Sequence, residues 1–279
     1  MEEKTPAQAT DENYELLDSG GGRVLERLGG HVTTRACSQA WWRRKLGGGD
    51  WRKSQDLKQA AKTPIKIRVG TLLFQVGGAG GSFRALGPEL RDSWQRVTEM
   101  CAAYAAKNRR PARVLHLFAG VGGHTLAAAA GGASVAHVEA SAESLSRARE
   151  NAALNPLASR DIRWVADDPV KFAQRERLQN QRHDLIILDP HSSREAKHGF
   201  DLERGLPALL ATMSGLLSDT PLGVVLVCRQ GFIWPTTLLQ LMRHDLSIFG
   251  GTFEHGELLL SGAESVPAVP CGAYCRWWK

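Results

Sequence analysis

Downstream of Ala112 the chain alternates short apolar runs with helix-like segments. Such alternation is typical of βαβ units, in which helices connect parallel strands. It predicts an α/β fold with a doubly wound, mostly parallel, Rossmann-like sheet. The predicted strands are residues 114–118, 134–138, 162–165, 185–188 and 223–227, and the predicted helices are residues 125–130, 142–154, 170–178 and 206–217.

The first third of the chain has a different pattern. Residues 23–28, 65–69 and 72–76 alternate apolar and polar positions between glycine-rich turns, which predicts small antiparallel strands. Apolar positions spaced by three or four predict a helix over residues 88–106. We therefore expect a disordered tail over residues 1–13, a small basic β-rich domain over 14–86 and a main domain over 87–279.

The positive charge is concentrated in this first third. Residues 23–113 hold 19 Lys and Arg against 6 Asp and Glu, whereas the rest of the chain holds 16 against 23. The run Trp41-Trp42-Arg43-Arg44-Lys45 interleaves aromatic rings with cations, which suits base stacking and phosphate contact. The pattern favours a nucleic-acid-binding appendage. An ordinary solvated basic surface, with tryptophans serving the core, is the alternative.

Other sequence features exclude several classes of protein. No run approaches 18 apolar residues, and the polar N-terminus lacks the features of a secretory signal. The five cysteines are scattered without a matching Cys/His pair, which favours reduced thiols over a metal site. We expect a cytoplasmic protein without a metal.

A glycine-rich turn follows the first predicted strand of the main domain. Its residues, Phe118-Ala119-Gly120-Val121-Gly122-Gly123, lie where a ligand binds in doubly wound sheets, at the carboxyl ends of the strands. Glycine lets the backbone approach a ligand and leaves helix N-terminal amides available. A dinucleotide fingerprint requires a third glycine, but position 125 is threonine.

Acidic residues follow the next three strands in order. Glu139, with Ala140 beside it, suits the ribose hydroxyls of a nucleoside. Asp167 or Asp168 suits an adenine amino group, and Asp189 ends the fourth strand. Each acid alone could be a helix cap or turn former. Together they predict a nucleoside cofactor, S-adenosyl-L-methionine (SAM) rather than a dinucleotide.

Four segments of the chain match a known family in sequence. They are Tyr14-Glu15-Leu16-Leu17-Asp18-Ser19-Gly20, residues 114–120, Arg149-Glu150-Asn151-Ala152-Ala153-Leu154-Asn155 and Ile186-Ile187-Leu188-Asp189-Pro190. These segments resemble the class I methyltransferases that modify large-subunit ribosomal RNA, in particular the cytosine-C5 type and its relatives. The resemblance implies that Asp189 and Pro190 are catalytic and, through the linker-like residues 87–93, that Arg91 reaches the cofactor.

Two departures from the family pattern bear on the reaction. The family has Asp-Pro-Pro, whereas this chain has Asp189-Pro190-His191-Ser192, so His191 is either an acid/base group or a tolerated neighbour. Methylation at cytosine C5 requires a thiolate that first adds to C6. Cys228 is the candidate nucleophile, but alignment on Gly231 places Arg229 at the family's cysteine position, so an ordinary buried cysteine is the alternative.

These features predict a SAM-dependent methyltransferase acting on a base in RNA, with ribosomal RNA as substrate. A small-molecule or protein methyltransferase, or a catalytically silent SAM-fold protein that binds RNA, are the alternatives. A nicotinamide-dependent oxidoreductase is disfavoured by Thr125. The basic region is expected to bind RNA, with a homodimer surface as the other possibility.

Overall fold

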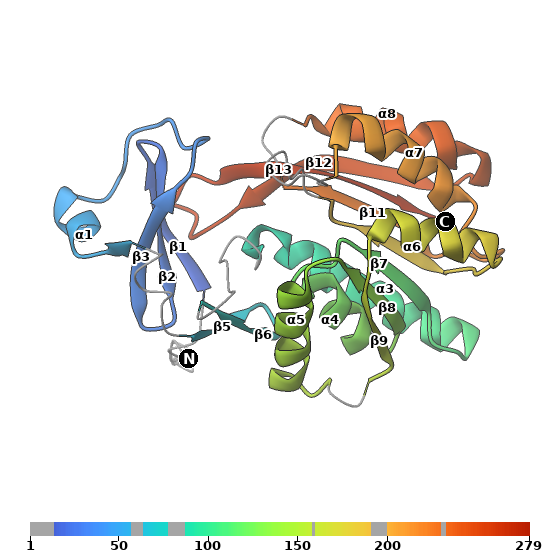
Figure 1. The fold of residues 1–279 in the computed structure, drawn as a ribbon. Helices are drawn as coiled ribbons and strands as arrows, with labels where there is room; N and C mark the ends of the chain where they lie inside the picture. Colours follow the sequence, from blue (N-terminus) through green and yellow to red (C-terminus); the bar gives the residue numbers. More distant parts are fainter. Residues whose placement is uncertain (1–13, 57–63, 78–86, 158–159, 191–199, 230–232) are drawn as a thin grey trace, which may run out of the picture. The chain divides into compact units, whose positions relative to one another are not determined.

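The computed structural model describes residues 14–56, 64–77, 87–157, 160–190, 200–229 and 233–279 (Figure 1). The chain divides into two compact units. Unit 1 comprises Met1–Pro88 together with Leu260–Val269, and unit 2 comprises Glu89–Leu259 together with Pro270–Lys279. The predicted division at residue 86 differs from this one in that a late segment clusters with the N-terminal region.

Five parallel strands, from β11 to the edge strand β9, make up most of a seven-stranded sheet in unit 2. The strand order is β12-β13-β11-β10-β7-β8-β9, with β13 antiparallel to β11. The predicted doubly wound, mostly parallel sheet is confirmed. The strands are β7 (Arg113–Leu117), β8 (Ser134–Glu139), β9 (Ile162–Ala166), β10 (Leu185–Leu188), β11 (Gly223–Cys228), β12 (Thr252–Leu260) and β13 (Val269–Trp278).

Helices cover both faces of this sheet. In Figure 1, α3, α4 and α5 lie along one face and α6, α7 and α8 along the other. Leucines of β7, β10 and β11 pack with α7 and α8 in one buried cluster, which is the main core of the unit. The helices are α3 (Arg91–Asn108), α4 (Gly123–Ala130), α5 (Ala142–Leu154), α6 (Pro169–Leu178), α7 (Leu202–Ser214) and α8 (Pro235–Leu246), with short 3₁₀ turns η2 (Pro88–Leu90) and η3 (Ser247–Phe249).

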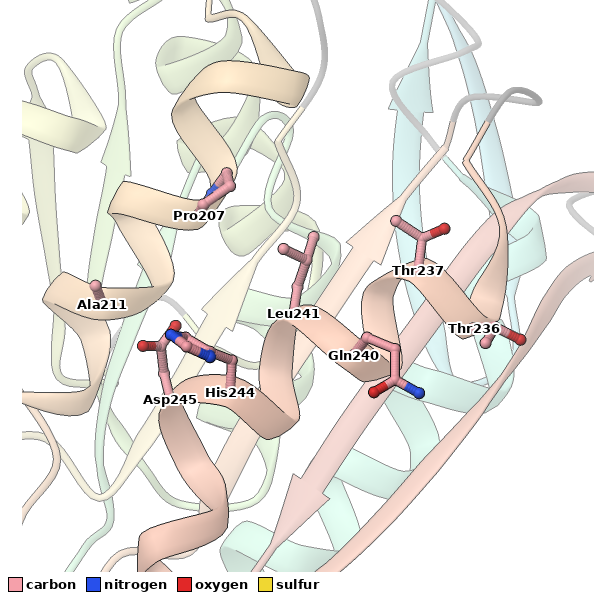
Figure 2. A pocket seen from close by; sticks show the side chains of 8 residues that line it. All are labelled: Pro207, Ala211, Thr236, Thr237, Gln240, Leu241, His244 and Asp245. Carbon is pink, nitrogen blue, oxygen red and sulfur yellow. The ribbon is translucent and has the colours of Figure 1, made fainter.

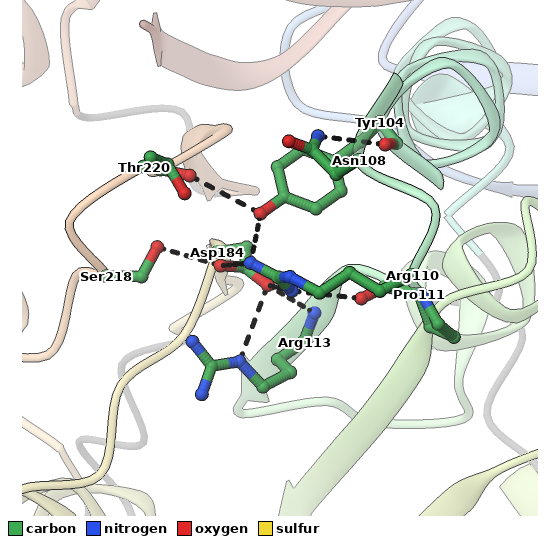
Figure 3. Close-up of polar contacts among 8 residues, drawn as sticks. All are labelled: Tyr104, Asn108, Arg110, Pro111, Arg113, Asp184, Ser218 and Thr220. Carbon is green, nitrogen blue, oxygen red and sulfur yellow. Dashed lines mark hydrogen bonds and ion pairs between the residues drawn. The ribbon is translucent and has the colours of Figure 1, made fainter. Parts of the chain in front are cut away.

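A polar network fixes the amino-terminal edge of the sheet, beside the start of β10 (Figure 3). The fully buried carboxylate of Asp184 accepts hydrogen bonds from Arg110 (2.6 and 3.0 Å), the backbone and side chain of Arg113 (2.9 and 3.5 Å) and Ser218 (2.7 Å). Burial acts to raise the pKa of Asp184, but these hydrogen bonds outweigh it and hold the pKa well below its usual range.

Unit 1 is mostly antiparallel β structure. A four-stranded sheet has the order β1-β2-β3-β4, and β5 pairs antiparallel with β6. The periodic segments 23–28, 65–69 and 72–76 each form the predicted strand. The elements are β1 (Tyr14–Gly20), β2 (Arg23–Leu28), β3 (His31–Ala36), α1 (Gly48–Arg52), β4 (Gln55–Asp56), β5 (Ile65–Val69) and β6 (Leu72–Val76).

Two helices of unit 2 depart from the sequence expectations. The helix expected over residues 206–217 begins at Leu202, because the Asp201 side chain accepts hydrogen bonds from the backbone of Glu203 and Arg204 and caps the helix there. Helix α8 was not predicted, although Pro235 opens it in a position that proline favours. Among the described residues, none of the helices has the length and apolar character needed to span a bilayer.

Candidate cofactor and catalytic site

The candidate residues gather where the carboxyl ends of the parallel strands meet. Strand β7 lies between β8 and β10, so the switch point of the doubly wound sheet is at β7 and β10. Backbone hydrogen bonds join the strand ends in series: Ala119 N donates to Val138 O (3.1 Å), Asp189 N to Leu117 O (3.3 Å) and Asp167 N to Glu139 O (3.2 Å). Four predicted sites, scattered over some 70 residues of sequence, thus share one edge.

The glycine-rich turn between β7 and α4 is partly open and partly packed. Gly120 has a positive φ of 53°, and a Cβ built there would meet no other atom within 4 Å. A Cβ on Gly122 would approach that of Ala148 to 3.3 Å, and one on Gly123 would collide with the Trp94 ring at 2.5 Å. Gly120 therefore lies beside open space, whereas Gly122 and Gly123 allow close packing of helices.

Phe118 and Ala119 form the buried start of the same turn. Phe118 is not a glycine, yet its φ is +56°, an uncommon conformation for a bulky residue. Its ring packs on Phe200 with a centroid separation of 4.9 Å. A strained backbone conformation of this kind persists only where its surroundings enforce it, and it is more frequent at binding sites.

Glu139 ties the turn to the end of β8. Its Oε2 accepts a hydrogen bond from Gly120 N (2.9 Å) and its Oε1 accepts one from Ser141 N (2.8 Å), while only 6% of the residue is exposed. Each carboxylate oxygen can accept a second hydrogen bond. Glu139 thus organises the turn and keeps acceptor capacity for two hydroxyl groups. Ala140, its neighbour, is exposed.

Asp167 and Asp168 follow β9 and both have protein partners. Asp168 caps α6 by accepting from Lys171 N (2.9 Å), as the alternative interpretation of this residue required. Asp167 pairs with Arg175 and accepts from the backbone of Asp168. The backbone of Asp167 donates to that of Glu139 (3.2 Å), so this segment begins beside Glu139 at the edge.

Asp189 ends β10 and forms a two-pronged ion pair with Arg229. The distances are 3.2 Å from Arg229 Nε to Asp189 Oδ1 and 3.0 Å from Nη2 to Oδ2. Burial acts to lower the pKa of Arg229, but the charges of Asp189 and Glu89 outweigh it and raise that pKa. Pro190 is buried next to Asp189, and His191 and Ser192 lie outside the described residues.

Cys228 lies in the core rather than at the open edge. The residue is fully buried among the apolar side chains of β11, α7 and α8. Burial, followed by the charge of Asp189, raises the pKa of the Cys228 thiol strongly. A thiol in such surroundings is a poor source of thiolate.

The last candidate, Arg91, opens α3. Its guanidinium is more than half exposed and pairs with Asp92 at 3.3 Å. The structure therefore gives Arg91 a surface position at a helix N-terminus, where it pairs with its neighbour in the sequence.

A buried polar network lies behind the glycine-rich turn, between the sheet and α3 and α4. The Thr125 hydroxyl bridges Nδ1 of His116 (2.8 Å) and Nδ1 of His137 (2.9 Å), and Ser93 bonds His124 (2.8 Å). Burial and nearby cationic side chains lower the pKa of His124 and of His137 to about 3. These rings are neutral near pH 7. The network therefore joins β7, β8, α3 and α4 behind the turn through hydrogen bonds between uncharged groups.

A separate groove of about 620 Å³ lies between α7 and α8 (Figure 2). None of the sequence-predicted site residues lines it. Its lining is Pro207, Ala211, Thr236, Thr237, Gln240, Leu241, His244 and Asp245.

Sequence reasoning missed Arg229 as a site residue, although it noted the position. The available signal was a cation directly after the fifth strand, at the same edge as Asp189. It also missed Ser141, whose amide holds Glu139 and whose side chain caps α5. No spacing rule identifies that contact, because it depends on how the chain turns after β8.

Three comparisons with known proteins bear on this site. Residues 83–201 match a family model described as conserved hypothetical protein 95. Ribosomal RNA large subunit methyltransferase K/L of Shewanella baltica (strain OS195) is 35% identical over 129 residues, which is 45% of this chain and 17% of that protein. Ribosomal RNA large subunit methyltransferase I of Aeromonas hydrophila is 32% identical over 177 residues, which is 62% of this chain and 44% of that protein.

The chain thus spans less than half the length of either curated relative. A solved structure, that of the SAM-dependent methyltransferase from Agrobacterium tumefaciens, superposes with a TM-score of 0.84 at 27% identity, covering 95% of this chain and 90% of that one. The chain therefore has the class I SAM-dependent methyltransferase fold, and its sequence resembles the large-subunit ribosomal RNA methyltransferases.

Proposed function

We propose that the chain is a SAM-dependent methyltransferase that acts on a base in RNA, with ribosomal RNA as the substrate. The observation that carries the proposal is the carboxyl edge itself. There Glu139 holds Gly120 beside open space, and Asp189 ends the neighbouring central strand. The relatives at 35% and 32% identity, both named as ribosomal RNA methyltransferases, support the choice of RNA.

The residues present suit SAM. Glu139 has one free acceptor position on each oxygen for the two ribose hydroxyls. The backbone of Phe118, Ala119 and Gly120 would border the amino-acid part, and Asp167 or Asp168 would receive the adenine amino group. SAM, when bound, supplies a methyl group on a positively charged sulfur. The task of the protein is to align that methyl group with the target atom.

Unit 1 offers a surface for RNA around Trp41. Asp18 is buried and accepts from Lys45 N (3.1 Å), Leu46 N (2.9 Å) and Trp51 Nε1 (3.0 Å), so it fixes the loop that carries the aromatic and basic run. Trp41 on this loop is 83% exposed. Such a ring can stack on an unpaired base.

The other tryptophan of the run, Trp42, and the nearby Trp51 serve the fold. Trp42 donates to Ser19 (3.0 Å), Trp51 is buried, and the Arg44 guanidinium stacks on the Trp51 ring at 4.0 Å. The stacking function proposed for this region therefore rests on Trp41, and the phosphate contacts on exposed neighbours such as Arg43.

The cofactor claim is tested by titrating SAM and, separately, NAD into the purified protein by calorimetry. We expect SAM binding that is abolished in Gly120→Arg, whose side chain would fill the open space, and that persists in Gly30→Arg, a glycine also free of close neighbours. Because Asp168 caps a helix, Asp168→Ala is compared with Asp168→Ser, which keeps a cap without the carboxylate. Absence of SAM binding by the wild type would overturn the proposal.

The substrate claim is tested by methyl transfer from labelled SAM to ribosomal RNA fragments, free proteins and a small-molecule pool. RNA is expected to be the labelled fraction, and its binding should weaken steeply with salt, whereas binding of a small molecule should not. Trp41→Ala should weaken RNA binding by about 5- to 100-fold, which corresponds to loss of one stacked base. Gel filtration of the same variant separates an RNA surface from a homodimer surface, since only the latter changes the elution volume.

A further inference from the structure

An exposed tryptophan, Trp234, lies at the carboxyl edge of unit 2. All eight tryptophans of the chain belong to its described part, and of these only Trp41 and Trp234 are exposed. Trp234 is 70% exposed, and its indole has no hydrogen-bond, ring-stacking or cation partner among the described residues. Tryptophan is enriched at binding interfaces because its ring offers a large apolar face. The free ring of Trp234 therefore calls for a ligand that is itself flat and apolar on one side.

Trp234 lies on the half of the edge opposite the proposed ribose and adenine residues. In the sheet order β11-β10-β7-β8-β9, Glu139 and Asp167 follow β8 and β9, whereas Trp234 follows β11. Arg229, which pairs with Asp189 at this edge, precedes Trp234 by five residues. Five residues of extended chain span at most about 18 Å. The ring is thus within reach of the proposed reaction site, on the side that remains for an acceptor.

The backbone that carries the ring is held in place. Trp234 is the N-cap of α8 with φ −88° and ψ 143°, an extended conformation that the following Pro235 favours. Before it, Ile233 packs against the main core cluster, and after it Leu238 and Leu239 are buried in that cluster. A ligand that contacts the ring does not have to order this part of the chain, which lowers the entropic cost of binding.

Polar side chains follow the ring along α8. Thr236 and Thr237 are exposed on its first turn and Gln240 is exposed one turn further on, where all three line the groove between α7 and α8 (Figure 2). A surface for an apolar protein partner would surround the ring with further apolar side chains. Hydroxyl and amide groups instead suit the sugar and phosphate of a nucleic acid strand whose base lies on the ring.

We infer that Trp234 stacks on a base of the substrate RNA that flanks the target nucleotide, an inference that rests on the proposed function. The target base has to reach Asp189 and Arg229, whose side chains are only 10% and 19% exposed. The ring of Trp234 is open to solvent, so it takes a base outside that shielded place. Stacking uses the face of a base, which all four bases possess, so Trp234 positions the strand without selecting its sequence.

The experiment measures methyl transfer from labelled SAM to a ribosomal RNA fragment for the wild type, Trp234→Ala, Trp234→Phe and Ile248→Ala. Ile248 is the matched control, because it is 81% exposed and lies in η3, just past the other end of α8. We expect Trp234→Ala to raise the KM for RNA about 5- to 100-fold, the loss of one stacked base, with kcat and SAM affinity at wild-type values. Trp234→Phe keeps a ring and should retain most of the RNA affinity, and Ile248→Ala should change neither constant.

Abasic substitutions identify the stacked base. Once mass spectrometry has located the methylated nucleotide of the fragment, abasic residues replace its neighbours one at a time. At the stacked position the abasic residue should weaken binding to the wild type but should weaken binding to Trp234→Ala no further, because the two changes remove the same contact. Exchange of that base for another base should have little effect.

Contrary results separate this inference from the proposed function. The inference alone is overturned by an unchanged KM for RNA in Trp234→Ala or by an equal change in Ile248→Ala. A lower kcat with an unchanged KM in Trp234→Ala also overturns it, because the ring then acts on the target base itself. Binding of SAM without methyl transfer to any RNA would overturn the proposed function and, with it, the inference.

Discussion

Asp184 and Asp189 lie at opposite ends of one strand, β10, and each is buried against arginine. Asp184 accepts hydrogen bonds from Arg110, Arg113 and Ser218, so its oxygens are saturated by the protein. Asp189 receives two, both from Arg229, and faces the open edge. The same residue type in the same strand thus stabilises the sheet at one end and keeps free acceptor positions at the other.

The largest loss of stability is expected from removal of the Asp184 carboxylate. Asp184→Ala removes the acceptor of Arg110, of the Arg113 amide and of Ser218 together, and we expect the free energy of unfolding to fall by about 3–5 kcal/mol. Urea unfolding followed by circular dichroism measures it. Asp189→Ala should cost less, because Glu89 still offsets the charge of Arg229. Equal losses of stability in the two variants would show that Asp184 and Asp189 contribute alike to the fold.

The dependence of stability on pH distinguishes the buried histidine network near the carboxyl edge from Asp184 at the other end of β10. The pKa of His124 and of His137 in the folded protein is about 3, below the ordinary value near 6.5. Between these values the unfolded chain binds more protons, so stability falls as the pH drops, by about 1.4 kcal/mol per pH unit for each ring. His116 acts in the same direction.

This loss should begin just below pH 6.5, whereas the stability contributed by Asp184 is present above its unfolded pKa and is lost only at more acidic pH. Urea unfolding at a series of pH values measures both. Exchange of the exposed His31 for Gln is the control and should leave the slope unchanged. A flat profile between pH 6.5 and 4.5 would contradict the buried, neutral network.

At the carboxyl edge, Gly123 is expected to matter for packing and Gly120 for binding. A methyl group on Gly123 would overlap the Trp94 ring, so Gly123→Ala should destabilise the protein by about 1–3 kcal/mol. Gly120→Ala should act mainly on SAM affinity, apart from a cost of about 1–2 kcal/mol for its positive φ. Thermal unfolding and calorimetry on the pair check this. Loss of SAM affinity in Gly123→Ala together with loss of stability in Gly120→Ala would contradict these assignments.

The smallest expected effect is that of neutralising Glu139. Glu139→Gln keeps the shape of the side chain but weakens a charge-assisted hydrogen bond, and we expect SAM affinity to fall about 5- to 30-fold, or about 1–2 kcal/mol. Calorimetric titration measures it, with Glu143→Gln, on the exposed start of α5, as the matched control. An unchanged affinity for SAM would show that Glu139 does not contact the cofactor.

The sequence predicted the centre of the parallel sheet because β10 and β11 are buried along their whole length and read as uninterrupted apolar runs. β10 was predicted with its observed bounds, and β7 within one residue. It could not distinguish Gly120 from Gly123, since the difference lies in Trp94, which precedes them by almost thirty residues and belongs to another helix. Nor could it decide between a nucleophile and an ordinary buried cysteine at Cys228, because register decides which of two adjacent residues faces the core.

The network around Asp184 went unnoticed for a related reason. Its members are ordinary charged residues spread from Arg110 to Ser218, and only the pairing of β7 with β10 brings them together. Local patterns therefore predict which strands exist and which residues end them. They do not predict which carboxylate will be saturated.

The segment between β12 and β13 determines whether unit 1 can be separated from the rest of the chain. Leu260–Val269 clusters with unit 1, where Gly262 lies against the Leu16 carbonyl and the carbonyls of Ser265 and Pro267 accept from Lys45 and Ser19. The chain consequently passes between the units three times. Unit 1 therefore cannot be removed or exchanged at a single point in the chain. Its two segments are separated by the residues from Glu89 to Leu259, so both must be replaced together in any engineered or recombined form.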